Sequence, residues 1–284
     1  RGMRATGSEL VGLVPLGVLL DAGYFYLRRQ NRSLGIPEDE ILQLAIKSLG
    51  LDELAPFDPQ KKVIEYRMRS SAAGGLSQMS LERFSAAVAS ENPAPGGGSV
   101  SAALGALAAA LGAMVANVSA NKRGWEDRLQ GFSDLAESGQ RARVRLLALI
   151  DEDSEAFDAV LAAQRLPAEG DAAREARDEA MAVALRRAVA VPLSVMREAM
   201  ALGEMLQSLA TEGAPDAVSD AFVGLLCLRA AVRGAGANVR INSAQMAGDR
   251  EIVAMRLEAE AIEAAAADLE LRVQEHVAAR SPGW

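Results

Sequence analysis

The chain has 284 residues, enough for one large domain or two ordinary ones, and its hydrophobic residues, 50% of the total, can fill a sizeable core. Only 4% of the residues are aromatic and alanine is abundant, which favours closely packed helices over a sheet sandwich. Lysine and arginine number 30 against 38 acidic residues, and the formal charge of -8 excludes a general nucleic-acid-binding surface.

One cysteine, Cys227, and one histidine, His276, are present in the whole chain. An intrachain disulfide is therefore impossible, and both a zinc site of the usual kind and a Ser-His-Asp relay lack the side chains they need. We expect a protein of the reducing cytoplasm that holds no metal. Its chemistry should be carried by carboxylates, amides and backbone groups.

The first 70 residues have an α/β pattern. Residues 7–16 are typical of a strand that runs into a turn, and residues 63–67 of a second, short strand. Between them the pattern predicts helices over residues 18–29 and 38–49, the second with Pro37 at its first turn. We interpret this segment as the end of a larger domain.

Two apolar stretches resemble export or membrane segments. The run at residues 10–20 is flanked by Glu9 and Asp21, and no Ala-x-Ala cleavage site follows it, so we expect no signal peptide. Residues 100–118 have a membrane-like length, but they are rich in alanine and glycine and lack a basic or aromatic belt. We therefore expect this stretch to be a buried helix of a protein that does not enter a membrane.

Residues 71–79 have the composition of a linker, which separates a first domain at residues 1–70 from a second at residues 80–284. The second domain has a helical pattern almost throughout, and Pro192 either begins a new helix or kinks a continuous one. The predicted helices run from Ser80 to before Pro93 and over residues 99–120, 125–164, 171–189, 192–212, 215–236 and 238–279. Repeated small residues such as Gly105 and Gly112 suit a tight bundle or a dimer formed through helices.

A glycine-rich turn precedes the helix at residues 99–120. It consists of Pro95, Gly96, Gly97 and Gly98, and another proline, Pro93, lies two residues before Pro95. Ser99 or Ser101 can cap the helix that follows. Backbone N–H groups at such a turn can bind a carboxylate, a phosphate or the polar edge of a heterocycle. A closely packed joint between loop and helix would look the same, so both interpretations stay open.

Five acidic residues lie within eight positions at residues 151–158, and helical spacing separates them. Asp151, Glu155 and Asp158 share one polar face, where we expect them to be solvated. Asp153 falls on the apolar stripe instead. Burial there would raise its pKa and let it remain protonated near neutral pH, as a general acid requires. The alternative is a structural aspartate paired with an arginine of another helix.

Three further groups are candidates for ligand binding. Asn238 and Asn242 lie one helical turn apart and present two amides that suit the edge of a pterin-like ring, although an interhelical hydrogen-bond pair would look the same. Asp220 lies early in a helix, where capping alone would explain it. Arg123 and Arg187 belong to basic pairs that could bind the carboxylates of a glutamate tail, although most such pairs are solvated.

From about residue 80 to residue 280, the chain resembles the formiminotetrahydrofolate cyclodeaminase family. The matching motifs are Pro93-Ala94-Pro95-Gly96-Gly97-Gly98-Ser99-Val100, residues 151–157, residues 185–193, Ser219-Asp220, and Asn238-Val239-Arg240-Ile241-Asn242, in the order of the family. Residues 7–67 resemble the C-terminal end of glutamate formiminotransferase. Together they are similar to the second half of the bifunctional formiminotransferase-cyclodeaminases of histidine breakdown.

The resemblance implies a mainly α protein, a helical cyclodeaminase bundle preceded by a short α/β remnant, with its site at a homodimer interface. It implies closure of 5-formiminotetrahydrofolate to 5,10-methenyltetrahydrofolate with release of ammonia, with Asp153 as the catalytic aspartate. The substrate is a tetrahydrofolate derivative, with or without a polyglutamate tail, and no further cofactor is implied. Because family transferases use a histidine upstream and this chain has none before His276, we expect no transferase activity from these residues alone.

Two other functions remain possible at this point. Methenyltetrahydrofolate cyclohydrolase is a similar helical protein that acts on the same product ring, although the transferase-like segment favours the cyclodeaminase. A folate-binding or assembly module without catalysis is the alternative of another class, and the placement of Asp153 on an apolar stripe disfavours it.

Overall fold

The structure is a computed structural model that describes residues 7–70, 74–246 and 248–280. The chain divides into two compact units. The first contains Arg1–Gly74 and Ala116–Gln140, and the second contains Gly75–Val115 and Arg141–Trp284. The predicted linker at residues 71–79 includes residues 71–73, which lie outside the described residues, and continues into the short 3-10 helix η1 (Leu76–Gln78).

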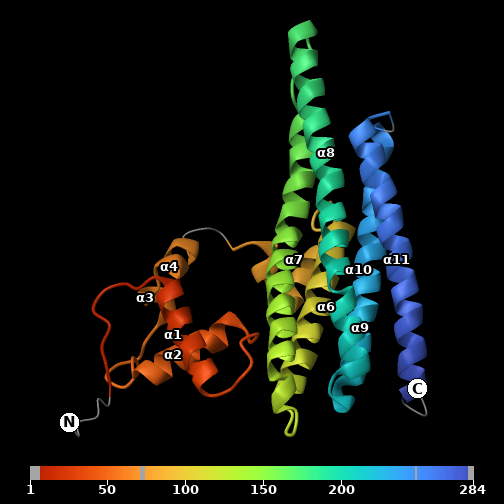
Figure 1. The fold of residues 1–284 in the computed structure, drawn as a ribbon. Helices are drawn as coiled ribbons and strands as arrows, with labels where there is room; N and C mark the ends of the chain where they lie inside the picture. The colour runs from red at the N-terminus through yellow and green to blue at the C-terminus, as the bar shows by residue number, and fades with distance from the viewer. Residues whose placement is uncertain (1–6, 71–73, 247, 281–284) are drawn as a thin grey trace, which may run out of the picture. The chain divides into compact units, whose positions relative to one another are not determined.

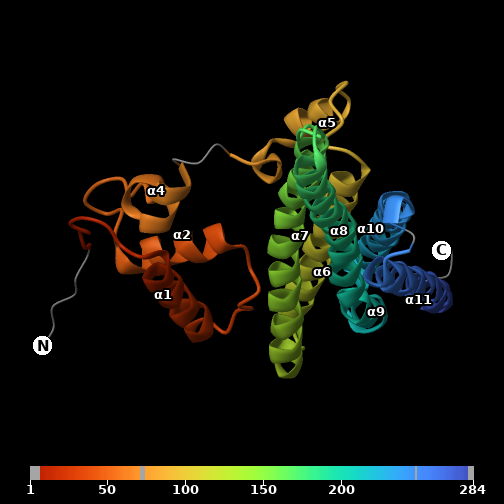
Figure 2. The ribbon, with the colours of Figure 1, turned by 90° about the horizontal axis from the view of Figure 1, so that it is seen from above.

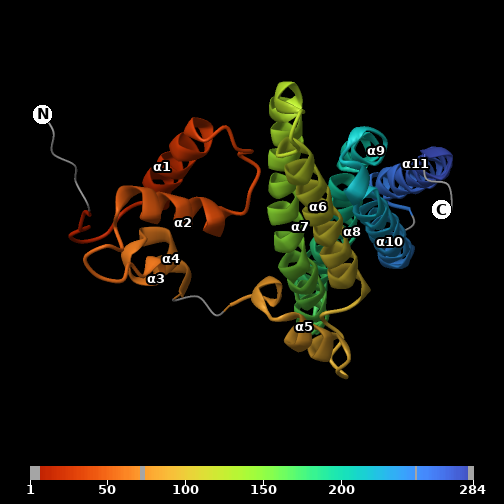
Figure 3. The same ribbon diagram turned by 90° about the horizontal axis from the view of Figure 1, so that it is seen from below.

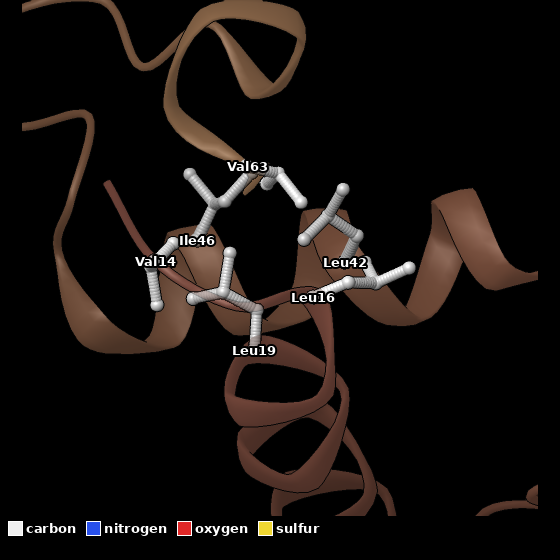
Figure 4. Close-up of a cluster of buried hydrophobic side chains, with 6 residues drawn as sticks. All are labelled: Val14, Leu16, Leu19, Leu42, Ile46 and Val63. Carbon is white, nitrogen blue, oxygen red and sulfur yellow. The ribbon is translucent and has the colours of Figure 1, made fainter. Parts of the chain in front are cut away.

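In the first unit, four helices surround a small apolar core (Figures 1 and 4). They are α1 (Leu16–Arg29), α2 (Glu38–Leu49), α3 (Pro59–Lys62) and α4 (Ile64–Ser70). Both α1 and α2 lie where the sequence pattern predicts them. In Figure 4 six buried side chains from α1, α2 and the flanking segments point toward one another: Val14, Leu16, Leu19, Leu42, Ile46 and Val63.

The two predicted strands of this unit do not form. Among the described residues the only β pairing is an isolated parallel bridge between Val14 and Val63, in which the Ile64 N–H donates to the Val14 carbonyl at 3.1 Å. A strand needs a partner along its length, and here the chain after Val63 turns into α4. Glu65 of α4 accepts a hydrogen bond of 2.7 Å from the Leu16 N–H. It thereby satisfies one of the N–H groups in the first turn of α1 that have no partner within the helix.

The second unit is a bundle of long helices (Figures 1, 2 and 3). Its elements are α5 (Leu81–Val88), α6 (Gly97–Ala120), α7 (Leu129–Gln164), α8 (Asp171–Ala201), α9 (Gly203–Glu212), α10 (Val218–Ser243) and α11 (Arg250–Arg280), of which parts of α6 and α7 belong to the first unit. Helix α10 packs against α8, α9 and α11. Figures 1 and 2 show α8 between α7 and α10, and Figure 3 shows α6 beside α7.

Small residues bring these helices close together, as the sequence predicts. A Cβ atom at Gly105 of α6 would lie 2.9 Å from Leu146 Cδ2 of α7, and one at Gly203 of α9 would lie 2.8 Å from Leu269 Cδ2 of α11. Both distances are shorter than ordinary van der Waals contact. At both positions a larger residue would force the facing leucine side chain to move.

The helix boundaries near residues 190 and 237 differ from the prediction. Helix α8 continues through Pro192 as a single helix and ends at Ala201, and α10 continues past residue 237 to Ser243. Because proline has no N–H, Pro192 leaves the carbonyl of Ala188 without its usual donor. The structure supplies one from outside the helix: the Asn242 side-chain amide donates to the Ala188 oxygen at 2.7 Å.

Within the part of the chain that the structure describes, two helical segments are long and apolar enough, by length and composition alone, to cross a membrane. They are α6 and residues Pro215–Met246, and 61% of the apolar window of α6 is buried inside the structure. Core helices of globular bundles have the same properties. The burial of α6 agrees with its prediction as a core helix.

Candidate active site

A cavity of about 310 Å³ lies in the second unit, between the turn at the start of α6, the C-terminal third of α7, the middle of α8 and the C-terminal end of α10. Six of the residues singled out in the sequence line it: Gly96, Gly97, Gly98, Asp153, Asn238 and Asn242. They come from segments far apart in the chain. The bundle therefore brings the glycine turn, one acid and the two amides to a single place.

The glycine turn forms the first turn of α6, which begins at Gly97, two residues earlier than predicted. The Val100 N–H donates to the Gly96 carbonyl at 3.0 Å, and Ser101 Oγ donates to the Gly97 carbonyl at 2.7 Å. Ser99 and Ser101, the two candidate caps, both lie inside the helix, and the Ser99 hydroxyl points across to α7. Pro95 is buried beneath this turn, while Pro93 and Ala94 line the cavity.

Asp153 of α7 faces the start of α6. Ser99 Oγ lies 2.9 Å from Asp153 Oδ2, and the Gly98 backbone approaches so closely that a Cβ atom there would lie 2.6 Å from the same oxygen. Burial raises the pKa of the Asp153 carboxyl above its ordinary value, and the hydrogen bonds from Ser99 oppose the rise. The expected half-buried carboxyl on an apolar stripe is present. Its role in catalysis remains a prediction.

The Ser99 hydroxyl can form a hydrogen bond with Asp153 whether the carboxyl group is ionised or protonated. Its single hydrogen has three acceptors within reach: Asp153 Oδ2, the Ile150 carbonyl at 3.2 Å and Ser154 Oγ at 3.4 Å. When Asp153 is a carboxylate, Ser99 donates to it. When Asp153 is protonated, Ser99 can donate to the Ile150 carbonyl and accept the acid's hydrogen through its own oxygen. Asp153 can therefore gain or lose a proton while it keeps its hydrogen bond with Ser99.

The side chains of Asn238 and Asn242 have different hydrogen-bond partners. The Asn238 side-chain amide donates to the Gly234 carbonyl of its own helix at 3.0 Å, and its Nδ2 atom would lie 3.4 Å from a Cβ atom at Gly97. Asn242 crosses to α8 and donates to Ala188. The interhelical reading of the pair is therefore correct for Asn242, and both side chains also line the cavity.

Three of the predicted ligand-binding residues lie outside this cavity in the single chain. Asp220 is in the first turn of α10, about 27 Å from Asn238 along the helix at 1.5 Å per residue. Arg187 points to the outside of α8 and pairs with Glu155 at 2.8 Å. Arg123 is exposed and belongs to the first unit. Proximity in sequence to a junction was a poor guide for the two arginines.

The prediction that Asp151 is solvated is wrong. It is half-buried, with Oδ1 accepting from the Leu76 N–H and Oδ2 from Ser77 Oγ, both at 2.6 Å. A Cβ atom at Gly75 would lie 2.6 Å from Asp151 Oδ1. The motif thus uses two aspartates in different ways: Asp151 holds the segment that leads into this unit, and Asp153 faces the cavity.

The cavity also contains residues that the sequence analysis did not select. Phe157, Val160 and Leu161 of α7 form an apolar wall together with Leu185 of α8, and the cavity's outer end has Gln164 and Gln245. The spacing of the α7 residues after Asp153, at four, seven and eight positions, follows the same helical stripe. That signal was available in the sequence. Among residues 7–70, 74–246 and 248–280, no three His, Cys, Asp or Glu side chains gather where they could hold a metal ion.

The fold and the cavity define a helical protein with a candidate site, in which one carboxyl group and two amides line the same cavity. A family model described as formiminotransferase-cyclodeaminase matches residues 80–261, and one described as formiminotransferase domain matches residues 1–69. The chain belongs to the formiminotransferase-cyclodeaminase family.

Individual relatives agree with this assignment. The formimidoyltransferase-cyclodeaminase of Rattus norvegicus is 39% identical over 244 residues, which are 86% of this chain and 45% of that protein. The chain therefore spans about half the length of the curated relatives it matches. A methenyltetrahydrofolate cyclohydrolase of Methylorubrum extorquens is 34% identical over 69% of this chain and 95% of its own length. The crystal structure of a formiminotetrahydrofolate cyclodeaminase from Thermotoga maritima superposes with a TM-score of 0.64 at 30% identity, covering 71% of this chain and 97% of that one.

Proposed function

We propose that the helical domain closes 5-formiminotetrahydrofolate to 5,10-methenyltetrahydrofolate and releases ammonia, with Asp153 as the general acid. The observation that carries the proposal is the placement of Asp153, a carboxyl whose pKa is raised by burial, in a cavity beside a glycine turn and two amides. A carboxyl group whose pKa is raised by burial holds its proton to higher pH and is suited to protonate a departing amine.

In the first step N10 of the folate attacks the formimino carbon. The N10–carbon bond forms as the carbon–nitrogen double bond becomes single, and the Asp153 carboxylic acid gives its proton to the imine nitrogen. This yields a tetrahedral carbon that bears an amino group, with a positive charge on N10. The N–H groups at the start of α6 and the two asparagine amides bind the pterin edge and hold N5 and N10 at Asp153.

In the second step the Asp153 carboxylate takes the hydrogen of N10 and passes it to the amino group. The carbon–nitrogen bond breaks, ammonia leaves, and the electron pair of N5 or N10 forms the methenyl cation. Ammonia thus carries the imine's own hydrogen, the hydrogen of N10 and the proton first given by Asp153. Water reprotonates Asp153, and one proton is consumed for each turnover.

The same chain is proposed to act without a metal or any further cofactor, in the cytoplasm, on folates with or without a polyglutamate tail. It binds neither nucleic acid nor membrane. The transferase reaction is not expected from these residues, because the family's transferase histidine has no counterpart and His276 lies exposed on α11. Assaying the transferase and the cyclodeaminase reactions on a longer form of this protein would test whether that form carries both activities.

We further propose that the domain is a homodimer whose partner covers an apolar stripe on α6 and α10. Leu107 is 54% exposed and Met114 is 36% exposed on α6, and Val223 and Leu226 of α10 are 47% and 41% exposed. On α6, Leu107 and Met114 are seven residues apart, about two helical turns, and so lie on the same side of the helix. Sedimentation velocity should report a dimer, and Leu107→Glu should shift it to the monomer.

Two assays test the catalytic proposal. The purified chain should release ammonia from 5-formiminotetrahydrofolate and produce the absorbance of the methenyl compound, and Asp153→Asn should slow this by about 10²–10⁴-fold. A loss smaller than about tenfold contradicts the role of Asp153. Folate binding with no ammonia release would instead indicate a non-catalytic module.

The second candidate function is methenyltetrahydrofolate cyclohydrolase. It is favoured by the Methylorubrum relative, which this chain matches along 95% of that relative's length. Incubation with 5,10-methenyltetrahydrofolate separates the two, because the cyclohydrolase would hydrolyse it at a rate above the spontaneous one and release no ammonia from the formimino compound.

A further inference from the structure

Phe157 of α7 is the only aromatic side chain among the described residues that line the cavity. It is 36% exposed, whereas Val160 and Leu185 on the same wall are buried. Covering a phenyl ring is favourable, and the folded chain leaves part of this one in contact with water. Phe157 therefore offers a bound ligand an apolar surface that the fold itself does not cover.

Phe157 lies one helical turn beyond Asp153. The two residues are four positions apart, about 6 Å along the axis of α7, and both side chains line the cavity. Long side chains of a helix lean toward its N-terminus, which for Phe157 is the side of Asp153. Packed aromatic rings have their centres about 4.5–7 Å apart. A ring bonded to an atom that is held at the Asp153 carboxyl is therefore within reach of Phe157.

Polar groups of the cavity lie at the level of Asp153. A Cβ atom at Gly98 would lie 2.6 Å from Asp153 Oδ2, and one at Gly97 would lie 3.4 Å from Asn238 Nδ2. The first turn of α6, the acid and one amide are thus neighbours. This part of the cavity suits a ring with polar edges, such as a pterin.

The lining becomes apolar in the next turns of α7. After Asp153, the next lining residues of this helix are Ala156, Phe157, Val160 and Leu161. Leu185 of α8 faces the same space and packs with Val160 in a buried cluster. The amide of Asn242, one turn beyond Asn238 on α10, donates to a backbone carbonyl of α8. This part of the cavity suits a ring without polar edges.

The proposed reaction decides which ring of a folate meets this apolar surface. Asp153 exchanges a proton with N10, so N10 lies within hydrogen-bond reach of the carboxyl, about 3 Å. In a folate N10 is bonded directly to the aminobenzoyl ring, which has no ring nitrogen, whereas a carbon atom separates N10 from the pterin. The aminobenzoyl ring therefore matches both the distance from Asp153 and the apolar lining.

We propose that Phe157 packs against the aminobenzoyl ring of the folate and that this contact raises the affinity about tenfold. The inference rests on the proposed function for the identity of the ligand and for the position of N10. It adds a residue that touches the substrate next to the reacting atoms and takes no part in proton transfer.

The first test removes the ring of Phe157 and then restores it. Phe157→Ala should weaken binding of 5-formyltetrahydrofolate about tenfold, which corresponds to about 1.4 kcal/mol, because the contact between the rings is lost. Phe157→Tyr keeps a ring and should bind within about threefold of the wild type. The matched control is Phe25→Ala on α1, at an exposed position outside the cavity lining, which should change the dissociation constant by less than twofold. Titration calorimetry on the complete chain measures all three variants.

A second ligand separates the ring from the glutamate. 5-Formyltetrahydropteroate has the aminobenzoyl ring and no glutamate, and each variant is compared with the wild type for the same ligand. Phe157→Ala should therefore weaken both ligands by the same factor. A loss confined to 5-formyltetrahydrofolate would place Phe157 at the glutamate and overturn the inference.

Nuclear magnetic resonance observes the contact directly. In a chain deuterated except at its phenylalanine rings, saturation of those rings should reach the aminobenzoyl protons of bound 5-formyltetrahydrofolate, because it passes only between protons in close contact. The transfer should be lost in Phe157→Leu, which keeps an apolar side chain at this position. Saturation that reached the protons of the pterin and not those of the aminobenzoyl ring would overturn the inference.

Failures of the inference and of the proposed function can be distinguished. An affinity that is unchanged in Phe157→Ala, in a chain that binds 5-formyltetrahydrofolate and releases ammonia from the formimino substrate, overturns the inference alone. Binding that depends on Phe157 in a chain that releases no ammonia overturns the proposed reaction alone. Absence of binding by the wild-type chain overturns both.

Discussion

Asn242 supplies the hydrogen-bond donor that Pro192 removes from α8. A residue with an N–H at position 192 would donate to the Ala188 carbonyl one turn earlier, and proline cannot. The Asn242 side-chain amide of α10 takes that place at 2.7 Å. The bond joins α8 to α10 at the wall of the cavity, so the donor missing from one helix fixes the position of a side-chain amide that lines the cavity.

A double-mutant cycle should reveal this dependence. Asn242→Ala leaves the Ala188 carbonyl unsatisfied and should lower the free energy of unfolding by about 1–3 kcal/mol. In a Pro192→Ala background the restored N–H can serve the carbonyl, so the same change should cost less, with a coupling of about 0.5–3 kcal/mol. Urea denaturation measures both. Asn238→Ala is the comparison, since its amide bonds only within its own helix, and equal costs in both backgrounds would contradict the link.

Gly98→Ala should abolish most of the activity. The added methyl group would overlap the Asp153 carboxyl, with the Asp153 Oδ2 atom 2.6 Å from the new Cβ, so the acid must leave its position. We expect ammonia release to fall by about 10²-fold or more, comparable to the loss of a general acid. Gly131→Ala is the matched control, because it lies in α7 with open space around its Cβ position. It should leave activity unchanged and increase stability by up to about 1 kcal/mol. Similar activities in the two variants would refute the steric argument.

Ser99→Ala should shift the pH dependence of turnover toward higher pH. Hydrogen bonds from Ser99 stabilise the Asp153 carboxylate and so lower its pKa, against the larger effect of burial, which raises it. The acid must be protonated to act, so the rate falls as pH rises through this pKa. Removing the hydroxyl raises the pKa further, and the alkaline limb of the kcat profile should move upward. A limb that moved to lower pH would contradict this assignment.

Asp151→Asn should loosen the segment that enters the helical unit. The carboxylate accepts from the Leu76 N–H and the Ser77 hydroxyl, and an amide can accept at only one of its two positions. We expect a loss of about 1–3 kcal/mol in the free energy of unfolding and faster proteolysis near residue 76. Asp158→Asn, at an exposed position of the same helix, is the control. The pH dependence of turnover should be unchanged in the Asp151→Asn variant, because Asp153 makes its hydrogen bond with Ser99 and not with Leu76 or Ser77.

Much of the helical fold was predictable because helix signals are local. The 3.6-residue period and the flanking prolines and serines predicted α1, α2 and the start of α5 closely, and Ser80 caps α5 by accepting a hydrogen bond from the Arg83 N–H. The same period placed Asp153 on the buried side of α7. The predicted strand at residues 63–67 was wrong, because β-branched residues form a strand only where another strand pairs with them along its length.

The sequence by itself determined the helical class, the glycine turn, the family and the acid that faces the apolar side, since composition, period and motif order are properties of the chain. Only the tertiary structure decided that Gly98 closes over Asp153, that Asp151 holds the entering segment, and that Asn242 satisfies the carbonyl freed by Pro192. It also separated Asn238 and Asn242 from Asp220 and Arg187. Contacts between helices depend on how far each helix continues and how it turns against its neighbours, and neighbours in space are not neighbours in sequence.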